Sequence, residues 1–218
     1  MMQEVIVNES ILSKNDRHAK TLRAIFAQHR LFVCNLMSSP GSGKTSLLES
    51  FARLSTSFAV IEGDLQTNRD TERLQQCGIL SQQISTGDLC HLDAQMVAGC
   101  FETLSPKLAG QEILFIENVG NLVCPASYDV GAHINVVLLS VSEGDDKVLK
   151  YPTMFLRADC VMVSKVDLLP HFAFEMDRIR DDLAQLGKQI PILPISTKDD
   201  ISIRNAWDYL LQRRAQCV

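Results

Sequence analysis

Short apolar runs alternate with amphipathic stretches along most of the 218-residue chain. Six runs have the length of a buried strand and are bounded by turn or polar residues: 31–37, 58–61, 113–116, 135–141, 159–163 and 190–195. Five segments between and after them have helical spacing of apolar positions: 44–54, 70–77, 92–108, 172–187 and 201–213. This alternation predicts an α/β fold, a mostly parallel sheet flanked by helices on both faces.

An additional helix is predicted ahead of the first strand, over about residues 13–29. Its small and apolar positions include Ala19, Leu22 and Phe26, at helical spacing, and Ser13 is a candidate N-cap. The sequence has no internal repeat, low-complexity tract or linker. We therefore expect one domain over residues 1–218.

Composition narrows the class of protein. Apolar residues make up 46% and charged residues 22%, so the chain has enough hydrophobic material to fold. Its 21 Lys and Arg against 26 Asp and Glu disfavour nucleic acid and anionic membranes as partners. No apolar run approaches the roughly 20 residues of a membrane span, and the first residues lack the pattern of a signal peptide. Seven scattered cysteines do not resemble a disulfide framework, so we expect a cytoplasmic protein with reduced thiols.

A glycine-rich turn follows the first predicted strand. Residues 38–45 read Ser-Ser-Pro-Gly-Ser-Gly-Lys-Thr and lead into a helical segment, which matches a P-loop except that Ser38 replaces the usual glycine. Backbone N–H groups in such a turn wrap phosphates, the lysine reaches the terminal phosphates and the threonine hydroxyl binds Mg²⁺. The predicted nucleotide-binding residues here are Gly41, Ser42, Gly43, Lys44, Thr45 and Ser46, and Lys44 is also a predicted catalytic residue.

Two carboxylates lie where predicted strands end. Asp64 and Glu117 each follow an apolar run, as magnesium ligands at the carboxyl edge of a parallel sheet do, and we assign Asp64 a catalytic role as well. The alternative is a solvated strand end or a helix cap. The polar segment 63–73 is a candidate switch that responds to the γ-phosphate. Without a clear arginine finger or water-orienting glutamine, although Gln66 and Arg69 are candidates, intrinsic hydrolysis should be slow.

A second motif concerns the choice of base. Lys165 and Asp167 end a predicted strand in a Lys-x-Asp pattern similar to the base-reading motif of GTPases, with Ser164 in place of the usual asparagine. A carboxylate accepts two hydrogen bonds from guanine that adenine cannot donate. The pattern therefore predicts GTP, and Ser196 and Thr197 loosely resemble the second base-contacting loop. The alternative is that these are ordinary surface charges.

Cysteine and histidine side chains form one further candidate site. Cys90 and His91 are adjacent ahead of a predicted helix, and Cys124 lies in another loop. Two thiolates and an imidazole suit Zn²⁺ or Ni²⁺, and three ligands leave one position open for a transferable metal. Because cysteines are often simply buried, spacing alone leaves both interpretations open.

These motifs together resemble the HypB family, the hydrogenase nickel-incorporation GTPases. The specific blocks are Cys-His-Leu-Asp-Ala at 90–94 and Asn-Leu-Val-Cys-Pro at 121–125, and the resemblance runs over roughly residues 13–213 with the P-loop, 62–67, 143–147 and 150–152. It implies a dimeric, metal-binding GTPase that delivers nickel to the large subunit of nickel-iron hydrogenase with a small zinc-containing nickel chaperone. It also implies that Cys90, His91 and Cys124 are the metal ligands, near the dimer interface.

The chain departs from that family in two places. Residues 1–30 contain no cysteine and only His18 and His29, so we expect no separate N-terminal metal store. Residues 196–200 read Ser-Thr-Lys-Asp-Asp, where the family often has a glycine-containing turn, so the guanine pocket is expected to be looser. The alternative functions are a urease-type nickel-insertion GTPase, a metal-storage or metal-sensing protein with little turnover, and a kinase.

Overall fold

Parallel strands form the centre of the protein. The computed structural model describes residues 2–64 and 68–218, with side chains described from residue 11 onward in those ranges. Within them, seven strands form one all-parallel sheet in the order β3-β2-β4-β1-β5-β6-β7. The strands are β1 (Phe32–Ser38), β2 (Phe58–Asp64), β3 (Leu80–Ser85), β4 (Ile113–Glu117), β5 (Ile134–Ser140), β6 (Cys160–Ser164) and β7 (Ile192–Pro194). The predicted α/β class is confirmed.

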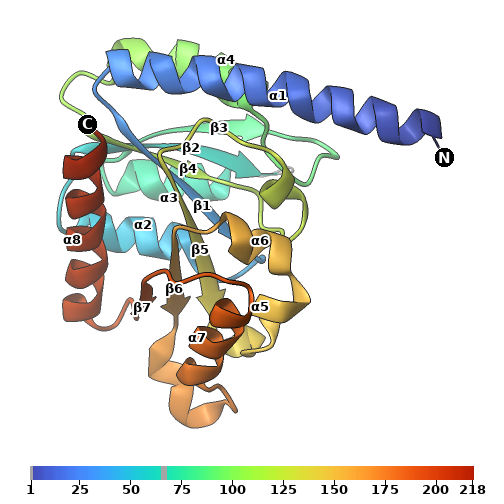
Figure 1. Cartoon of the computed structure of the whole chain (residues 1–218). Coiled ribbons are helices and arrows are strands. Elements are labelled where there is room, and N and C mark those ends of the chain that lie inside the picture. Colours follow the sequence, from blue (N-terminus) through green and yellow to red (C-terminus); the bar gives the residue numbers. More distant parts are fainter. Residues whose placement is uncertain (1, 65–67) are drawn as a thin grey trace.

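Helices cover the sheet on both faces (Figure 1). They are α1 (Met2–Gln28), α2 (Lys44–Ala52), α3 (Arg69–Gln76), α4 (Ala94–Leu104), α5 (Lys147–Lys150), α6 (Pro152–Arg157), α7 (Met176–Gln185) and α8 (Asp200–Cys217). Short 3-10 turns also occur: η1 (Ser105–Lys107), η2 (Cys124–Ser127), η3 (Val141–Glu143) and η4 (Val166–His171). Helices α1 and α4 lie together on one side of the sheet, and α2 and α8 lie on the other (Figure 1).

The central strand β1 explains why the strands have nearly continuous apolar runs. Phe32 and Leu36 pack into the core cluster beneath α2 and α8, whereas Val33 packs into the cluster beneath α1 and α4. Successive side chains of a strand point to opposite faces, and helices cover both. The ring of Trp207 from α8 contacts the ring of Phe51 from α2, with 5.1 Å between centroids.

The predicted elements need correction at several places. The sequence analysis missed strand β3 because Ser81, Gln82 and Gln83 make it polar. As an edge strand, β3 pairs with one strand only, and most of its residues are partly exposed. Helix α1 begins at Met2 rather than at Ser13, so Ser13 is not an N-cap. Helix α7 begins at Met176, four residues later than predicted, and the short helices α5 and α6 were not predicted.

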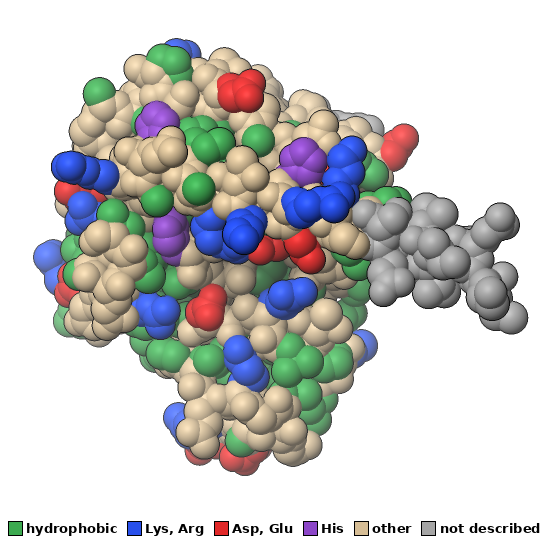
Figure 2. All heavy atoms as spheres, turned by 45° about the horizontal axis from the view of Figure 1, so that its top comes forward, with side chains coloured by type: hydrophobic (Ala, Val, Ile, Leu, Met, Phe, Trp, Pro, Cys, Tyr) green, Lys and Arg blue, Asp and Glu red, His purple; other side chains and the backbone are tan. Residues whose placement is uncertain are grey.

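The surface carries mixed charge. On the face turned forward in Figure 2, Lys and Arg side chains are interspersed with Asp and Glu side chains. Across the described ranges, we find no helix that combines the length and the apolar character required to span a bilayer.

The strand order determines where a ligand binds. Strand β1 lies between β4 and β5, and the chain continues from β1 toward one edge of the sheet and from β5 toward the other. In open α/β sheets this reversal leaves a crevice at the carboxyl ends of the strands. The turn after β1, the end of β4 and the loops after β5 and β6 all meet there.

Candidate functional site

The glycine-rich turn joins β1 to α2 in the geometry of a phosphate-binding loop. Gly41 and Gly43 have φ of 74° and 97°, which favours glycine, and Gly43 directly precedes the first residue of α2. Lys44 is buried, and its Nζ donates to Ser38 Oγ at 3.1 Å. The departure from the usual glycine at position 38 therefore adds a hydroxyl partner for the lysine.

Glu143 accepts hydrogen bonds from two serine hydroxyls of this turn. Ser42 Oγ donates to Glu143 Oε1 at 2.6 Å, and Ser39 Oγ donates to the other carboxylate oxygen. Glu143 lies in η3, directly after β5, about a hundred residues away in sequence. The sequence analysis includes Glu143 only in the family block 143–147, because a sequence does not reveal which distant loop a carboxylate contacts.

Of the three predicted magnesium ligands, Asp64 and Glu117 end the neighbouring strands β2 and β4, and Thr45 lies in the first turn of α2. Thr45 Oγ1 donates to Glu117 Oε1 at 2.8 Å, while Glu117 Oε2 is buried with no hydrogen-bond partner. Asp64 lines a cavity of about 220 Å³ together with Lys44 and Glu117. A buried carboxylate oxygen without a partner, beside a threonine hydroxyl, is a donor set that fits Mg²⁺.

Burial raises the pKa of two carboxyl groups that line this cavity. Desolvation raises the pKa of Glu117 to about 7, although the Lys44 ammonium and the Thr45 hydroxyl favour its charged form. Desolvation also raises the pKa of Glu62 to about 8, and the charges of Glu117 and Asp64 add to this effect. The sequence analysis gave no site role to Glu62, which follows the apolar run 58–61 within β2. A divalent cation would relieve the repulsion among these carboxylates.

The raised pKa of Glu117 gives a testable pH dependence. The folded state favours the protonated carboxyl, so this contribution to the unfolding free energy is present below about pH 4.5 and is lost as pH rises through about 7. Glu117→Gln keeps an oxygen for Thr45 without the charge. We expect it to stabilise the metal-free protein by up to about 3 kcal/mol near pH 8 and much less near pH 5. Urea unfolding in a chelator measures this difference.

The matched control is Glu102→Gln, on the exposed face of α4. It should leave the pH profile of the unfolding free energy unchanged. A Glu117→Gln profile parallel to wild type would contradict the assignment.

Arg73 is a charged residue beside the phosphate turn to which the sequence analysis gave no role of its own. Its guanidinium pairs with Glu49 at 2.7 Å and with Asp70 at 2.8 Å, and it lines a second cavity with Lys44 and Thr45. The previously named Arg69 is exposed at the start of α3. Residues 65–67 of the candidate switch, which include Gln66, lie outside the described residues.

The candidate base-reading residues lie on the other side of the turn. Asp167 Oδ1 accepts from Ser196 Oγ at 2.8 Å, and Oδ2 accepts from Lys198 Nζ at 2.7 Å. These two hydrogen bonds, the Lys198 one first, lower the pKa of Asp167. Lys165 Nζ donates to the Gly41 carbonyl at 2.7 Å. A cavity of about 90 Å³ is lined by residues that include Thr197, Ser46 and Ser164, so both sets of predicted nucleotide residues border the same turn.

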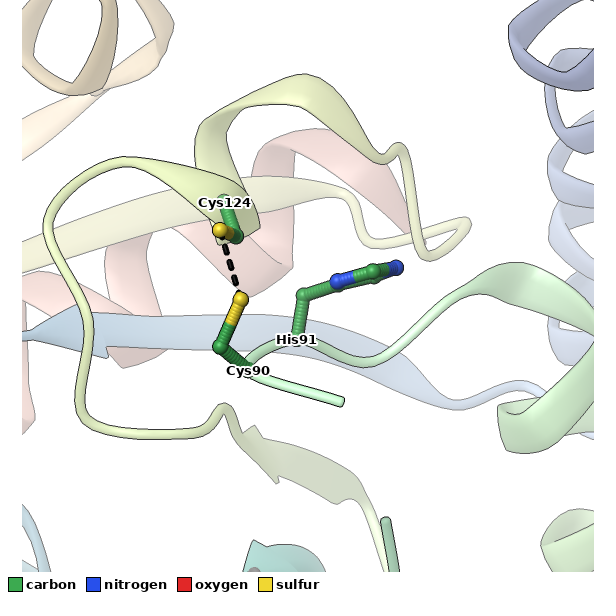
Figure 3. Close-up of side chains that lie close together, drawn as sticks. All are labelled: Cys90, His91 and Cys124. Carbon is green, nitrogen blue, oxygen red and sulfur yellow. Dashed lines mark hydrogen bonds between the residues drawn. The ribbon is translucent and has the colours of Figure 1, made fainter. Parts of the chain in front are cut away.

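The two cysteines and the histidine come together in space (Figure 3). One potential ligand atom from each of Cys90, His91 and Cys124 lies within 4.8 Å of the other two. The two thiols point toward each other, with 2.6 Å between sulfurs, and their hydrogen bond raises the pKa of Cys124 above its ordinary value. This donor set fits a soft or borderline divalent metal such as Ni²⁺ or Zn²⁺.

His91 is oriented by an aromatic neighbour. Its ring stacks on Tyr128, with 3.8 Å between centroids and 14° between planes, and its Nδ1 is buried without a hydrogen-bond partner. Burial lowers the pKa of His91 despite the nearby Asp93 carboxylate. A neutral imidazole with an uncommitted nitrogen is the form that binds a metal. Sequence spacing gave no sign of the Tyr128 contact.

Asn118 connects the two candidate sites. It follows Glu117 directly and is fully buried, and its Oδ1 accepts from the backbone N of Leu92, next to His91, at 3.2 Å. The side chain of Leu92 packs on Gly63, where an added Cβ would lie only 2.8 Å from it. The magnesium side, the start of the switch segment and the thiol site therefore share contacts.

Comparison with known proteins agrees with these motifs. The family model described as CobW/HypB/UreG, nucleotide-binding domain, matches residues 32–194. The hydrogenase/urease maturation factor HypB of Helicobacter hepaticus is 51% identical over 217 residues, which cover 98% of this chain and 90% of that protein. The chain belongs to the HypB family.

Two solved HypB structures have the same fold. The crystal structure of HypB from Helicobacter pylori in complex with nickel aligns with a TM-score of 0.91 at 48% identity, covering 93% of this chain and 96% of that one. HypB from Archaeoglobus fulgidus aligns with a TM-score of 0.83 at 32% identity, covering 93% and 99%. The HypB resemblance predicted from sequence is thus confirmed, and nucleotide binding follows from the family model.

Proposed function

We propose that this chain is a slow GTPase whose nucleotide state regulates delivery of nickel during maturation of a nickel enzyme. The observation that carries the proposal is the bridge from Glu117 through Asn118 to Leu92, because it joins a phosphate-binding turn to the Cys90–His91–Cys124 cluster. HypB relatives named as maturation factors and a nickel-bound HypB structure support it.

In the nucleotide site, residues 41–46 bind the phosphates, and Lys44 neutralises charge that develops on the transferred group. Thr45, Asp64 and Glu117 hold Mg²⁺ when it is bound, and the ion screens the phosphates and polarises the γ-phosphoryl group. Asp64 lies at the end of β2, directly before the switch segment, so a change at the γ-phosphate is transmitted to that segment first.

Guanine is selected by Asp167, with Ser196 and Thr197 beside it and the Lys165 stem against the base. Asp167→Ala should weaken GDP binding by about 10- to 100-fold and leave ADP binding unchanged, since hydrogen bonds to a charged group contribute about 1.5–3 kcal/mol. Competition of GDP and ADP against a fluorescent guanine nucleotide measures both affinities. Asp208→Ala, an exposed position on α8, is the control. An unchanged GDP preference in Asp167→Ala would remove Asp167 from the base site.

Nickel is the cargo, and Zn²⁺ is the rival ion for the same donors. The open fourth position leaves room for a ligand from the acceptor during transfer. Exposed apolar Leu89 and Val123, each next to a thiol, suit burial against a second copy of the chain, which supports a homodimer with the metal near its interface.

The proposed partners are a small zinc-containing nickel chaperone and the large subunit of nickel-iron hydrogenase. Because several relatives are named hydrogenase/urease maturation factors, urease maturation is a second candidate client. Nickel loading of each apo-enzyme by the purified chain distinguishes the two clients.

The deciding experiment titrates Ni²⁺ and Zn²⁺ into the reduced protein with GDP and with a non-hydrolysable GTP analogue, while dimer mass is followed. A metal affinity or dimer fraction that changes with the nucleotide supports regulated delivery. If neither the metal affinity nor the dimer fraction changes with the nucleotide, the chain is a metal-binding GTPase without regulated delivery. If the protein does not hydrolyse GTP, metal storage or metal sensing becomes the favoured function.

A further inference from the structure

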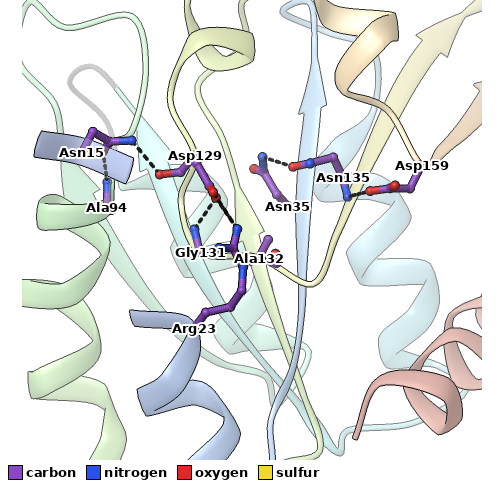
Figure 4. A network of polar contacts seen from close by, with 9 residues as sticks. All are labelled: Asn15, Arg23, Asn35, Ala94, Asp129, Gly131, Ala132, Asn135 and Asp159. Carbon is purple, nitrogen blue, oxygen red and sulfur yellow. Dashed lines mark hydrogen bonds and ion pairs between the residues drawn. The ribbon is translucent and has the colours of Figure 1, made fainter. Parts of the chain in front are cut away.

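Asn15 is a buried amide on the surface helix α1. It is 7% exposed, and both ends of its side chain are used (Figure 4). Its Oδ1 accepts from the backbone N of Ala94 at 2.9 Å, and its Nδ2 donates to the backbone O of Asp129 at 2.9 Å. The two partners are 79 and 114 residues away in sequence.

Each partner lies close in sequence to candidate metal ligands. Ala94 is the first residue of α4, three positions after His91. Asp129 lies five positions after Cys124 and directly after Tyr128, the residue that stacks on His91. A single amide therefore joins the two chain segments, and the separation of these segments determines the distance from Cys124 to Cys90 and His91.

A second residue of α1 holds only one of these loops. Arg23 Nη2 pairs with the Asp129 carboxylate at 2.6 Å, and its Nε donates to the Ala132 carbonyl at 3.3 Å. The same carboxylate accepts from the backbone N of Gly131 at 2.8 Å. Arg23 thus fixes the later loop to α1, whereas Asn15 also contacts the start of α4 (Figure 4).

We infer that Asn15 is a positioning residue for metal binding, which fastens the His91 segment to the Cys124 loop so that the three ligands are held together before metal arrives. The inference rests on the metal site proposed above. Without the amide, the Ala94 N–H and the Asp129 carbonyl lose their partner in a buried setting, and the loops separate to reach other partners. Residues that orient metal ligands typically change affinity by about 10- to 100-fold when removed.

The test compares full-length wild-type protein with Asn15→Ala and Asn15→Asp. Ni²⁺ affinity is measured by competition with a chelator, and the thiolate-to-nickel charge-transfer absorption reports ligand geometry. Asn15→Ala should weaken Ni²⁺ binding by about tenfold or more and alter the absorption band. Asn15→Asp keeps the acceptor for Ala94 but not the donor for Asp129, so its affinity should be intermediate. Hydrogen exchange in the metal-free protein should quicken at the Ala94 amide in Asn15→Ala.

The control for general loosening of α1 is Phe26→Leu, a buried position that packs on Phe101 of α4 and makes none of the polar contacts to the two segments. It should lower the melting temperature and leave Ni²⁺ affinity within twofold of wild type. The inference is overturned if Asn15→Ala retains wild-type affinity and absorption, or if Phe26→Leu weakens nickel binding equally. Nickel binding that survives Cys124→Ala would overturn the metal site and this inference with it, whereas binding lost in Cys124→Ala but kept in Asn15→Ala overturns the inference alone.

Discussion

Replacing Lys44 with alanine is expected to lower GTP hydrolysis by at least about 100-fold while leaving the nickel affinity of the nucleotide-free protein unchanged. The ammonium is buried at the start of α2 and borders the same cavity as Asp64 and Glu117. Its loss removes the main positive charge of the phosphate site and a charge that opposes the raised pKa of Glu117. Phosphate release under single-turnover conditions measures the effect.

The control is Lys107→Ala, an exposed lysine in η1. Since η1 precedes β4, it lies toward the amino-terminal ends of the strands, whereas the phosphate turn lies at their carboxyl ends. It should hydrolyse GTP at the wild-type rate. Nickel binding lost together with hydrolysis in Lys44→Ala would refute the separation of the two sites, and hydrolysis retained would remove Lys44 from catalysis.

Replacing Cys124 with alanine should weaken nickel binding by about 100-fold or more and leave GDP affinity within twofold. The thiol is one of two sulfurs in the cluster, so its loss leaves one thiolate and one imidazole. The substitution preserves the hydrogen bond from the Leu92 backbone N–H to the Asn118 side chain, which joins the two sites. Chelator competition and nucleotide titration measure the two affinities.

Cys217→Ala, an exposed thiol on α8, is the matched control because it removes one cysteine outside the cluster. Equal nickel affinities in the two variants would remove Cys124 from the site. A loss of GDP affinity in Cys124→Ala would show instead that the loop supports the nucleotide pocket directly.

The architecture was largely predictable because both faces of the sheet are covered. Strands such as β1 and β5 are buried on both sides, so they read as continuous apolar runs. The edge strand β3 has no such signature, since Gln82 and Gln83 sit in half-exposed positions. The start of α1 was misplaced because Ser13 resembles a cap although the helix continues through it.

The residues of the candidate sites could be selected from the sequence only where several of them lie close together in one motif. The phosphate turn and the Lys-x-Asp pattern are local, and the family blocks added Cys90, His91 and Cys124. Their supporting contacts are not local: Glu143 on the Ser39 and Ser42 hydroxyls, Tyr128 on His91, and Asn15 between two loops all join distant segments. No spacing rule encodes those pairings, because the tertiary fold creates them.

The ion pair between Lys198 and Asp167 has a consequence for the proposed base site. In the protein without nucleotide, the Asp167 carboxylate already has two partners, the Lys198 ammonium and the Ser196 hydroxyl. A guanine that binds at Asp167 as proposed would therefore exchange partners of the carboxylate rather than meet a bare charge, and the lysine would compete with the base for the same oxygen atom.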